Sequence, residues 1–222
     1  MQYLYHPDAG AKHLQLEGDP HRYLFKVRRH RAGEQVHLRS GDDTLYAYTI
    51  DTLDKKTAQL TLTDQTTLPI HAAHTLHIGW CQIDPKSIEK VLPILNEMGV
   101  AQLTFFPCAR SQQNFRLDHA RMQKILQNSS QQCGRTRPMI LEEAESLESF
   151  LTANSQAKLL HFSKDQNFQC TREDTVIIIG PEGGFTDTEV ARFTPEQIAG
   201  LGTPMILRSE SAAVAVAARV LV

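Results

Sequence analysis

Short segments in which apolar and polar residues alternate make up the first third of the chain. They are rich in leucine, β-branched residues and tyrosine, which favours strands. We predict strands over residues 36–38, 45–50 and 58–62, with turns at residues 41–43 and 54–56. A small barrel pairs the edges of such short strands. An all-β domain is therefore expected over residues 1–68, with a short linker after it.

Beyond residue 70 the apolar runs are longer, and helical periodicity occurs between them. We predict strands over residues 75–80, 103–106, 158–162, 175–180 and 205–207. We predict helices over residues 84–99, 117–132 and 209–222, and another that begins at Thr186. Strands that are apolar throughout and alternate with helices are typical of an α/β domain with a parallel sheet. This domain is expected to span residues 69–222.

Residue types at the ends of these helices support the assignment. Asp84 is a good N-cap, Pro85 suits the first turn, and Gly99 suits the end of the same helix. Pro93 lies inside that helix and is expected to kink it. Thr186 and Glu189 have the spacing of a capping box.

Composition adds few constraints. At 222 residues, 41% hydrophobic and 22% charged, the chain has ordinary globular values. It has no run of about 18 apolar residues and no signal-peptide pattern at its start, so we expect a cytoplasmic protein without a membrane segment. Cysteines 81, 108, 133 and 170 form no C-x-x-C pair, so we expect no metal site and reduced, mostly buried thiols.

The net charge of −2 argues at first against a nucleic-acid partner, but the charge is unevenly distributed. Residues 1–68 are neutral, residues 69–138 carry +4, and residues 139–222 carry −6. The segment from residue 21 to 31 contains five basic residues and no acidic residue. The segment from residue 110 to 137 contains six basic residues and one acidic residue. Two such clusters fit a polyanion, although solvated faces with distant counter-ions would look the same.

Two junctions between a strand and a helix carry candidate chemistry. The first is residues 179–186, Ile-Gly-Pro-Glu-Gly-Gly-Phe-Thr, at the carboxyl end of a strand, where open α/β sheets bind ligands. It is neither G-x-G-x-x-G nor a Walker A loop, so it fits a nucleoside better than a di- or triphosphate. A turn without a ligand is the other reading.

The second junction is residues 201–213, where Arg208, Ser209 and Glu210 stand between an apolar strand and an apolar helix. Charge in such a place is costly unless it is used or paired. The residues either serve a function, or form an Arg208–Glu210 ion pair with Ser209 as the N-cap.

Together the two junctions carry a resemblance. IIIGPEGGFTDTEV, followed by LGTPMILRSESAAVAVAARV, closely resembles the bacterial 16S ribosomal RNA uridine-N3 methyltransferase family, which belongs to the SPOUT (trefoil-knot) methyltransferases. The segment from His21 to Glu34, Glu97-Met98-Gly99-Val100 and Gln132-Cys133-Gly134-Arg135 also resemble family motifs, in the same order. The resemblance covers nearly the whole chain.

The resemblance implies an N-terminal PUA-like β-barrel that binds RNA and a C-terminal trefoil-knot domain that binds S-adenosyl-L-methionine and releases S-adenosyl-L-homocysteine. It implies a homodimer that acts on 16S ribosomal RNA in the small ribosomal subunit. The implied cofactor residues are Leu160, His161, Phe162, Gly180, Pro181, Glu182, Gly183, Gly184, Leu201, Gly202, Ile206, Leu207, Arg208, Ser209 and Ala212. The implied RNA-binding residues are His21, Arg22, Lys26, Arg28, Arg29, Arg31, Arg110, Arg135 and Arg137.

The implied reaction needs few protein groups. Uracil N3 must lose its proton, which leaves negative charge on N3 and the flanking carbonyl oxygens. Arg208 is the candidate that stabilises this charge. Glu210 is the first candidate for the base and Glu182 the second. The target base must be unpaired or flipped out.

Three other functions compete with this reading. One is a catalytically silent RNA-binding ribosome assembly factor, which would use the basic clusters alone. Another is a methyltransferase of the same fold that acts on a different nucleotide. The last is a Rossmann-type enzyme for small nucleotides. The absence of G-x-G-x-x-G and the late position of the glycine-rich loop argue against that enzyme.

Overall fold

The computed structural model describes residues 3–112, 115–161 and 175–222. They form two compact units. The first comprises Met1–His71 and Gln127–Pro138, and the second comprises Ala72–Leu126 and Met139–Val222.

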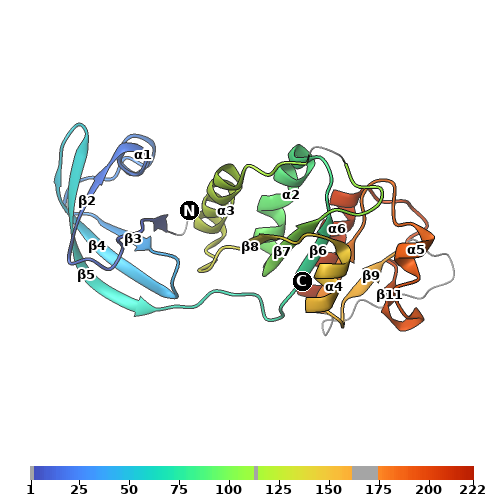
Figure 1. Cartoon of the computed structure of the whole chain (residues 1–222). Coiled ribbons are helices and arrows are strands. Elements are labelled where there is room, and N and C mark those ends of the chain that lie inside the picture. Colours follow the sequence, from blue (N-terminus) through green and yellow to red (C-terminus); the bar gives the residue numbers. More distant parts are fainter. Residues whose placement is uncertain (1–2, 113–114, 162–174) are drawn as a thin grey trace. The chain divides into compact units, whose positions relative to one another are not determined.

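The first unit is built on one curled sheet of five strands (Figure 1). Its strands are β1 Leu4–Tyr5, β2 His13–Glu17, β3 Gln35–Arg39, β4 Thr44–Leu53 and β5 Thr57–Thr67, in the order β1-β3-β4-β5-β2. Register shifts in the β4–β5 pair increase the local twist and help the sheet to curl. This half-barrel confirms the predicted all-β character of the N-terminal part.

The core of the first unit lies inside the curl. Alternate positions of each strand face inward, so that Leu16, Leu38, Ile50 and Leu60 are almost fully buried. A short helix, α1 Gly18–His21, continues into a π-helix, η1 Arg22–Val27, and its Leu24 and Phe25 join this core. The helical turns after β2 were not predicted from the sequence.

The second unit is a parallel sheet between helices, as predicted. Its strands are β6 His77–Cys81, β7 Gln102–Phe106, β8 Ile140–Glu143, β9 Lys158–Leu160, β10 Val176–Ile179 and β11 Ile198–Ala199. They are ordered β11-β9-β10-β6-β7-β8, and every pair is parallel. Its helices are α2 Pro85–Met98, α3 His119–Cys133, α4 Leu147–Ala153, α5 Asp187–Val190 and α6 Ser209–Leu221, with a 3₁₀ turn at η2 Pro195–Gln197.

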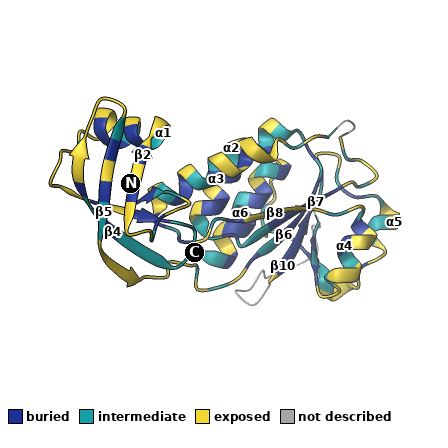
Figure 2. Ribbon diagram, turned by 60° about the vertical axis from the view of Figure 1, so that its left-hand side comes forward, coloured by how far each residue is buried: buried dark blue, intermediate teal, exposed yellow. Residues whose placement is uncertain are grey.

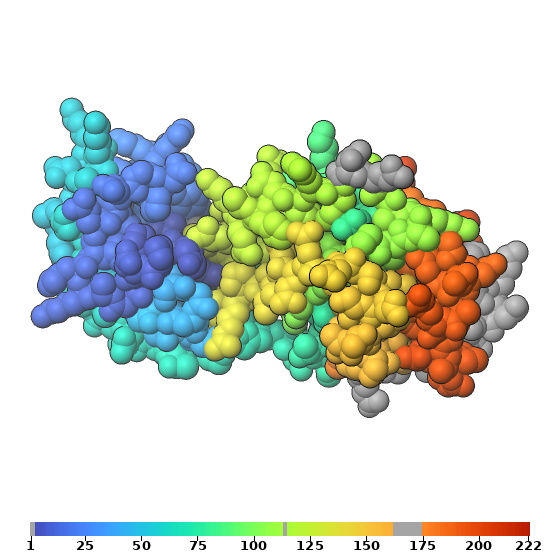
Figure 3. All heavy atoms as spheres, in the orientation of Figure 1, coloured from blue at the N-terminus to red at the C-terminus, as the bar shows by residue number. Residues whose placement is uncertain are grey.

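Both faces of this sheet are covered, which explains why its strands are apolar throughout. Ile177 and Ile179 of β10 pack with α2 and α6 on one face. Ile178 of the same strand packs with Phe150 of α4 on the other face. Figure 2 shows β6 and β10 buried over most of their length. Helices α4 and α5 lie side by side at the surface of this unit (Figure 3).

Most of the predicted helix ends are confirmed. Asp84 accepts a hydrogen bond from the Ser87 N–H, and Gly99 ends α2 with φ of 99°. Helix α2 continues through Pro93. Thr186 and Glu189 form the predicted capping box at α5. Helix α3 begins in the second unit, and its last turns belong to the first, because the division falls after Leu126.

One predicted strand is wrong. Residues 205–207 form no strand; the edge strand β11 is Ile198–Ala199. Met205 is 68% exposed and Ile206 is 82% exposed, so this apolar run lies on a loop and not in the sheet. A run of only three apolar residues after Pro204 is compatible both with a buried strand and with an exposed apolar loop, so the sequence pattern does not separate the two.

Candidate functional site

The two motif segments meet at the carboxyl edge of the parallel sheet. The β10 loop, residues 180–186, leaves the end of β10, and the α6 loop, residues 200–208, leads from β11 to α6. Because β10 lies in the middle of the sheet, its loop emerges among the ends of its neighbours. Ligands of open α/β sheets bind at this edge.

A compact turn gives the β10 loop its conformation. The Gly184 N–H donates to the Pro181 carbonyl oxygen at 2.9 Å, and Gly184 has φ of 65°, which favours glycine. Gly180 lies against the Phe185 ring, where a Cβ atom would come within 2.8 Å. The β10 loop therefore needs glycine at two positions for separate reasons.

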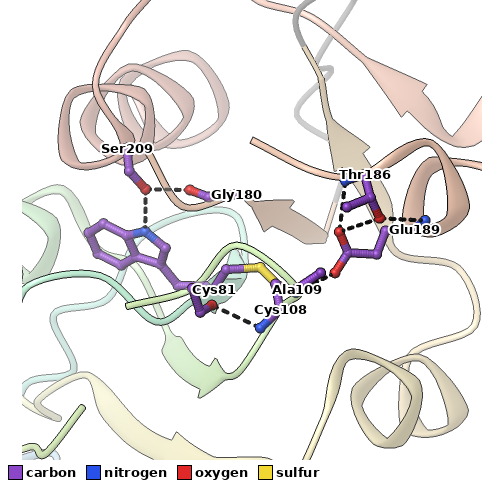
Figure 4. The surroundings of a disulfide bond; sticks show 9 residues. Cys81, Cys108, Ala109, Gly180, Thr186, Glu189 and Ser209 are labelled. Carbon is purple, nitrogen blue, oxygen red and sulfur yellow. Dashed lines mark hydrogen bonds between the residues drawn. A yellow bond between two sulfur atoms is a disulfide. The ribbon is translucent and has the colours of Figure 1, made fainter. Parts of the chain in front are cut away.

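Ser209 connects the start of α6 to the β10 loop and to β6. Its hydroxyl donates to the Gly180 carbonyl oxygen at 2.5 Å and accepts a hydrogen bond from the Trp80 indole N–H at 2.8 Å (Figure 4). Trp80 is fully buried on β6, and Ser209 is 5% exposed in the first turn of α6. Three elements that are far apart in the sequence are thus joined at one hydroxyl group.

The α6 loop exposes its apolar side chains. Ile206 and Met205 are mostly exposed, Leu207 is 36% exposed, and Gly202 has φ of 63° with open space where a Cβ atom would stand. Leu201 is half-buried and packs against the core that contains α6. An exposed apolar loop beside a glycine-rich turn can contact the face of an aromatic ring such as a purine.

The three catalytic candidates are not buried. Arg208 is exposed at the N-cap of α6, Glu210 is half-buried in the first turn, and Glu182 is exposed on the β10 loop. The alternative in which Arg208 pairs with Glu210 is not formed among the described residues. The Ser209 side chain bonds to Gly180 and Trp80 and is not a helix cap.

The remaining predicted cofactor residues differ in how far they are buried and in where they lie in the fold. Leu160 is half-buried at the end of β9, and the His161 N–H donates to the Ala199 carbonyl oxygen at 2.6 Å. Ala212 is 7% exposed and belongs to the core. Phe162 lies outside the described residues.

The predicted RNA cluster lies on α1, η1 and the loop after them. Its exposed members are Arg22, Lys26, Arg28, Arg29 and Arg31. Its sixth member, His21, is 4% exposed and its Nε2 lies 3.1 Å from the Asp54 carbonyl oxygen, so it faces the interior. Burial of one side of this helical turn directs the arginines outward.

The other predicted RNA-binding arginines have protein partners. Arg137 forms an ion pair with Asp43 at 2.6 Å, and Arg135 donates from Nε to the Arg137 carbonyl oxygen at 2.6 Å. Burial lowers the pKa of Arg135. A hydrogen bond from Thr136, together with the charge of Arg137, lowers the pKa of Asp43. These contacts all lie within the first unit.

Arg110 points at the β10 loop. Its Nη1 donates to the carbonyl oxygen of Gly183 at 2.8 Å and to that of Phe185 at 3.2 Å. Beside it, the Ala109 N–H donates to Glu189 Oε1 at 2.8 Å. Burial raises the pKa of Glu189, but hydrogen bonds from Ala109 and Thr186 outweigh it, so the pKa lies below its usual value. The sequence had assigned Arg110 only to RNA.

The expectation of reduced thiols is wrong for two cysteines. Cys81 at the end of β6 and Cys108 just after β7 form a disulfide, with a Cα–Cα distance of 5.8 Å (Figure 4). Parallel pairing of β6 with β7 brings the two together, since Cys81 stands opposite Phe106. A separation of 27 residues gives no sign of this in the sequence. Cys133 is free.

Two residues of the site were not predicted from the sequence. Trp80 looked like an ordinary strand residue, and Cys108 like a buried thiol. The one available signal was that Trp80 is the single tryptophan of the chain, and a buried indole N–H needs an acceptor.

Comparison with known proteins agrees with this geometry. Residues 71–221 match the family model of the RNA methyltransferase domain, and residues 16–63 match that of the RNA methyltransferase PUA domain. The chain is 37% identical over 221 residues to the ribosomal RNA small subunit methyltransferase E of Helicobacter pylori, covering 98% of both chains.

Solved structures have the same fold. A methyltransferase from Legionella pneumophila, in complex with S-adenosylmethionine, superimposes with a TM-score of 0.79 at 25% identity, over 98% of this chain and 95% of that one. The ribosomal RNA small subunit methyltransferase E of Neisseria gonorrhoeae, bound to S-adenosyl methionine, has the same TM-score and the same coverage of both chains, at 21% identity. The chain described here is therefore a member of the RNA methyltransferase family, with a PUA domain followed by an RNA methyltransferase domain of α/β fold.

Proposed function

We propose that this protein transfers the methyl group of S-adenosyl-L-methionine to N3 of a uridine in 16S ribosomal RNA. The observation that supports the proposal is the bridge at Ser209, which joins the β10 loop and β6 to the start of α6 at the ligand-binding edge of the sheet. The relative from Helicobacter pylori is named for the small-subunit ribosomal RNA, which supports the substrate class.

The residues present fit the cofactor. Open space surrounds Gly184 and Gly202, where Cβ atoms would meet nothing within 4 Å, so a ligand can approach the backbone of both loops. Exposed apolar side chains at Ile206 and Leu207 suit the adenine ring. Gly180–Gly184, Leu201, Gly202 and Ile206–Ser209 would hold the cofactor, with Leu160 and His161 at the neighbouring strand end. When bound, its sulfonium supplies an activated methyl group.

The protein itself must make the uracil nitrogen nucleophilic. Arg208 is exposed at the N-terminus of α6, where its guanidinium is free to stabilise negative charge on the uracil oxygens. Glu210, in the first turn of α6, is the proposed base for the N3 proton, and Glu182 on the β10 loop is the alternative. Both carboxylates border the site without an arginine partner among the described residues, so either is available as an acceptor.

RNA binding is assigned to the exposed cations of the helical turn in the first unit. Arg22, Lys26, Arg28, Arg29 and Arg31 carry five charges and no described carboxylate interrupts them. Such a surface binds phosphates with a strong dependence on salt. Arg135 and Arg137, in the same unit, are proposed to add to it despite their protein contacts.

We also propose a homodimer that acts in the cytoplasm, where ribosomal RNA is found. Met205 and Ile206 are more than half exposed on the α6 loop, and Val222 at the end of α6 is 76% exposed. A second subunit would cover apolar surface of this kind. Sedimentation equilibrium tests it: an Ile206→Asp variant should be monomeric, whereas a monomeric wild type contradicts the dimer.

Primer extension across 16S ribosomal RNA tests the reaction. An N3-methyl group blocks Watson–Crick pairing, so a reverse-transcriptase stop in the wild-type strain should disappear when the gene is deleted. A plasmid with the wild-type gene should restore the stop, and one with Arg208→Ala should not. If no stop changes on deletion, the assignment to uridine N3 is wrong.

Calorimetry tests the cofactor separately. The purified protein should bind S-adenosyl-L-homocysteine without RNA. Removal of residues 1–68 should abolish binding to 16S ribosomal RNA and retain cofactor binding. Failure of the full chain to bind this nucleoside would favour a silent assembly factor.

A further inference from the structure

We propose that Arg110 is a positioning residue for the cofactor, because it holds the β10 loop in the conformation that binds S-adenosyl-L-methionine. This inference rests on the proposed function, since it takes the β10 loop as part of the cofactor site. It differs from the expectation that Arg110 contacts RNA.

The contacts of Arg110 are with the loop backbone. One guanidinium nitrogen, Nη1, donates to the carbonyl oxygens of Gly183 and Phe185 at 2.8 and 3.2 Å. The aliphatic part of the side chain packs on Gly183, where an added Cβ atom would lie 3.3 Å from Arg110 Cβ and 3.4 Å from its Cδ. Hydrogen bonds from a charged donor are stronger than those between neutral groups.

The peptide unit between Phe185 and Thr186 is held at both ends. Its carbonyl oxygen accepts from Arg110, and its N–H donates to Glu189 Oε2 at 2.8 Å. Because a peptide unit is planar, two partners on opposite sides fix its orientation. Glu189 also accepts from the Ala109 N–H through its other oxygen. The segment around Arg110 thus contacts both sides of the same turn.

The segment that carries Arg110 is itself anchored. The Cys108 N–H donates to Ser111 Oγ at 2.8 Å, and the Gln112 N–H donates to the Gln82 carbonyl oxygen at 3.3 Å. The disulfide with Cys81 attaches the segment to the end of β6 (Figure 4). Arg110 therefore extends from a fixed base to a loop that has glycine at residues 180, 183 and 184.

Without Arg110 the loop should lose its preorganisation. Glycine permits many backbone conformations, so an unheld loop has to be ordered when the ligand binds. The cost should appear in cofactor affinity. It should not appear in RNA affinity, because the guanidinium is already engaged with protein carbonyl oxygens.

Calorimetric titration with S-adenosyl-L-homocysteine tests the proposal. Arg110→Gln should raise the Kd roughly tenfold, the effect of losing a charge-assisted hydrogen-bond pair. Arg110→Lys keeps a cation that can reach one carbonyl oxygen, so it should recover part of the affinity. Arg121→Gln is the matched control, because this arginine of the same basic stretch pairs with Glu89 at 2.8 Å and leaves the loop untouched.

Three further measurements make the result decisive. Thermal unfolding and circular dichroism of the ligand-free variants should match wild type, which separates positioning from misfolding. Filter binding of 16S ribosomal RNA to ligand-free Arg110→Gln should also match wild type. Equal nucleoside affinity of wild type and Arg110→Gln, or a loss confined to RNA affinity, overturns the inference. Wild type that binds no nucleoside overturns the proposed cofactor instead.

Discussion

Trp80 and Ser209 are hydrogen-bonded across 129 residues of sequence, from the buried indole N–H of β6 to the hydroxyl that begins α6. The same hydroxyl donates to the carbonyl oxygen of Gly180. A single side chain thus determines how the last helix approaches the β10 loop.

Replacement of Ser209 by alanine should destabilise the protein and weaken cofactor binding. The buried Trp80 N–H and the Gly180 carbonyl oxygen would both lose a partner, which costs about 2 kcal/mol of unfolding free energy. Urea denaturation measures the loss. Ser211→Ala, an exposed serine of the same helix, is the control. Equal stability of the two variants would contradict the role of the bridge.

Loss of the disulfide should lower stability without changing the fold. Cys81 and Cys108 close a loop with a sequence separation of 27, for which chain entropy gives about 3.5 kcal/mol. Cys108→Ser should therefore unfold at lower urea under non-reducing conditions, and a dithiol reductant should shift wild type similarly. The free Cys133 supplies the control variant, Cys133→Ser. Peptide mapping that finds both cysteines alkylated before reduction refutes the bond.

His77 should make stability depend on pH. Burial lowers its pKa from 6.5 to about 4, while Nε2 lies 2.8 Å from Thr104 Oγ1. The unfolded chain binds this proton between pH 6.5 and about 4 and the folded protein does not, so stability falls as the pH drops through that window. Because His77 is only partly buried, solvent screening reduces the effect, and the loss should be about 1 kcal/mol at pH 5. His77→Gln should lose less stability between pH 7 and 5. Parallel pH profiles for the two proteins would exclude His77 as the cause.

Substitutions of Arg29 can distinguish the effect of its charge on RNA binding from the effect of its backbone strain on stability. Its φ of 63° is unfavourable for any residue except glycine. Arg29→Gly should leave the protein as stable as wild type or up to about 1 kcal/mol more stable, whereas Arg29→Ala keeps the strain. Both should weaken RNA binding and reduce the slope of log affinity against log salt by about 1. An unchanged slope in filter binding would remove Arg29 from the RNA surface.

Local sequence patterns were sufficient to predict much of the fold. The helix from Asp84 to Gly99 and the capping box at Thr186 depend on residues within a few positions of each other. The parallel sheet was predicted from strands that are apolar on both faces. Short or weakly patterned elements, such as β2 and α4, were missed because few residues carry their signal.

The candidate site also has features that the sequence predicts and contacts that it does not. The loops that carry the motifs could be identified from the sequence, because the glycines at residues 180, 183 and 184 and the run from Arg208 to Glu210 reflect local backbone and charge requirements. What those loops contact depends on how the chain packs in three dimensions. Strand pairing placed Cys81 beside Cys108. Packing between segments distant in the sequence turned Arg110 toward the β10 loop and buried His21. Such contacts depend on chain segments that are dozens of residues apart, and no local pattern records which of them become neighbours.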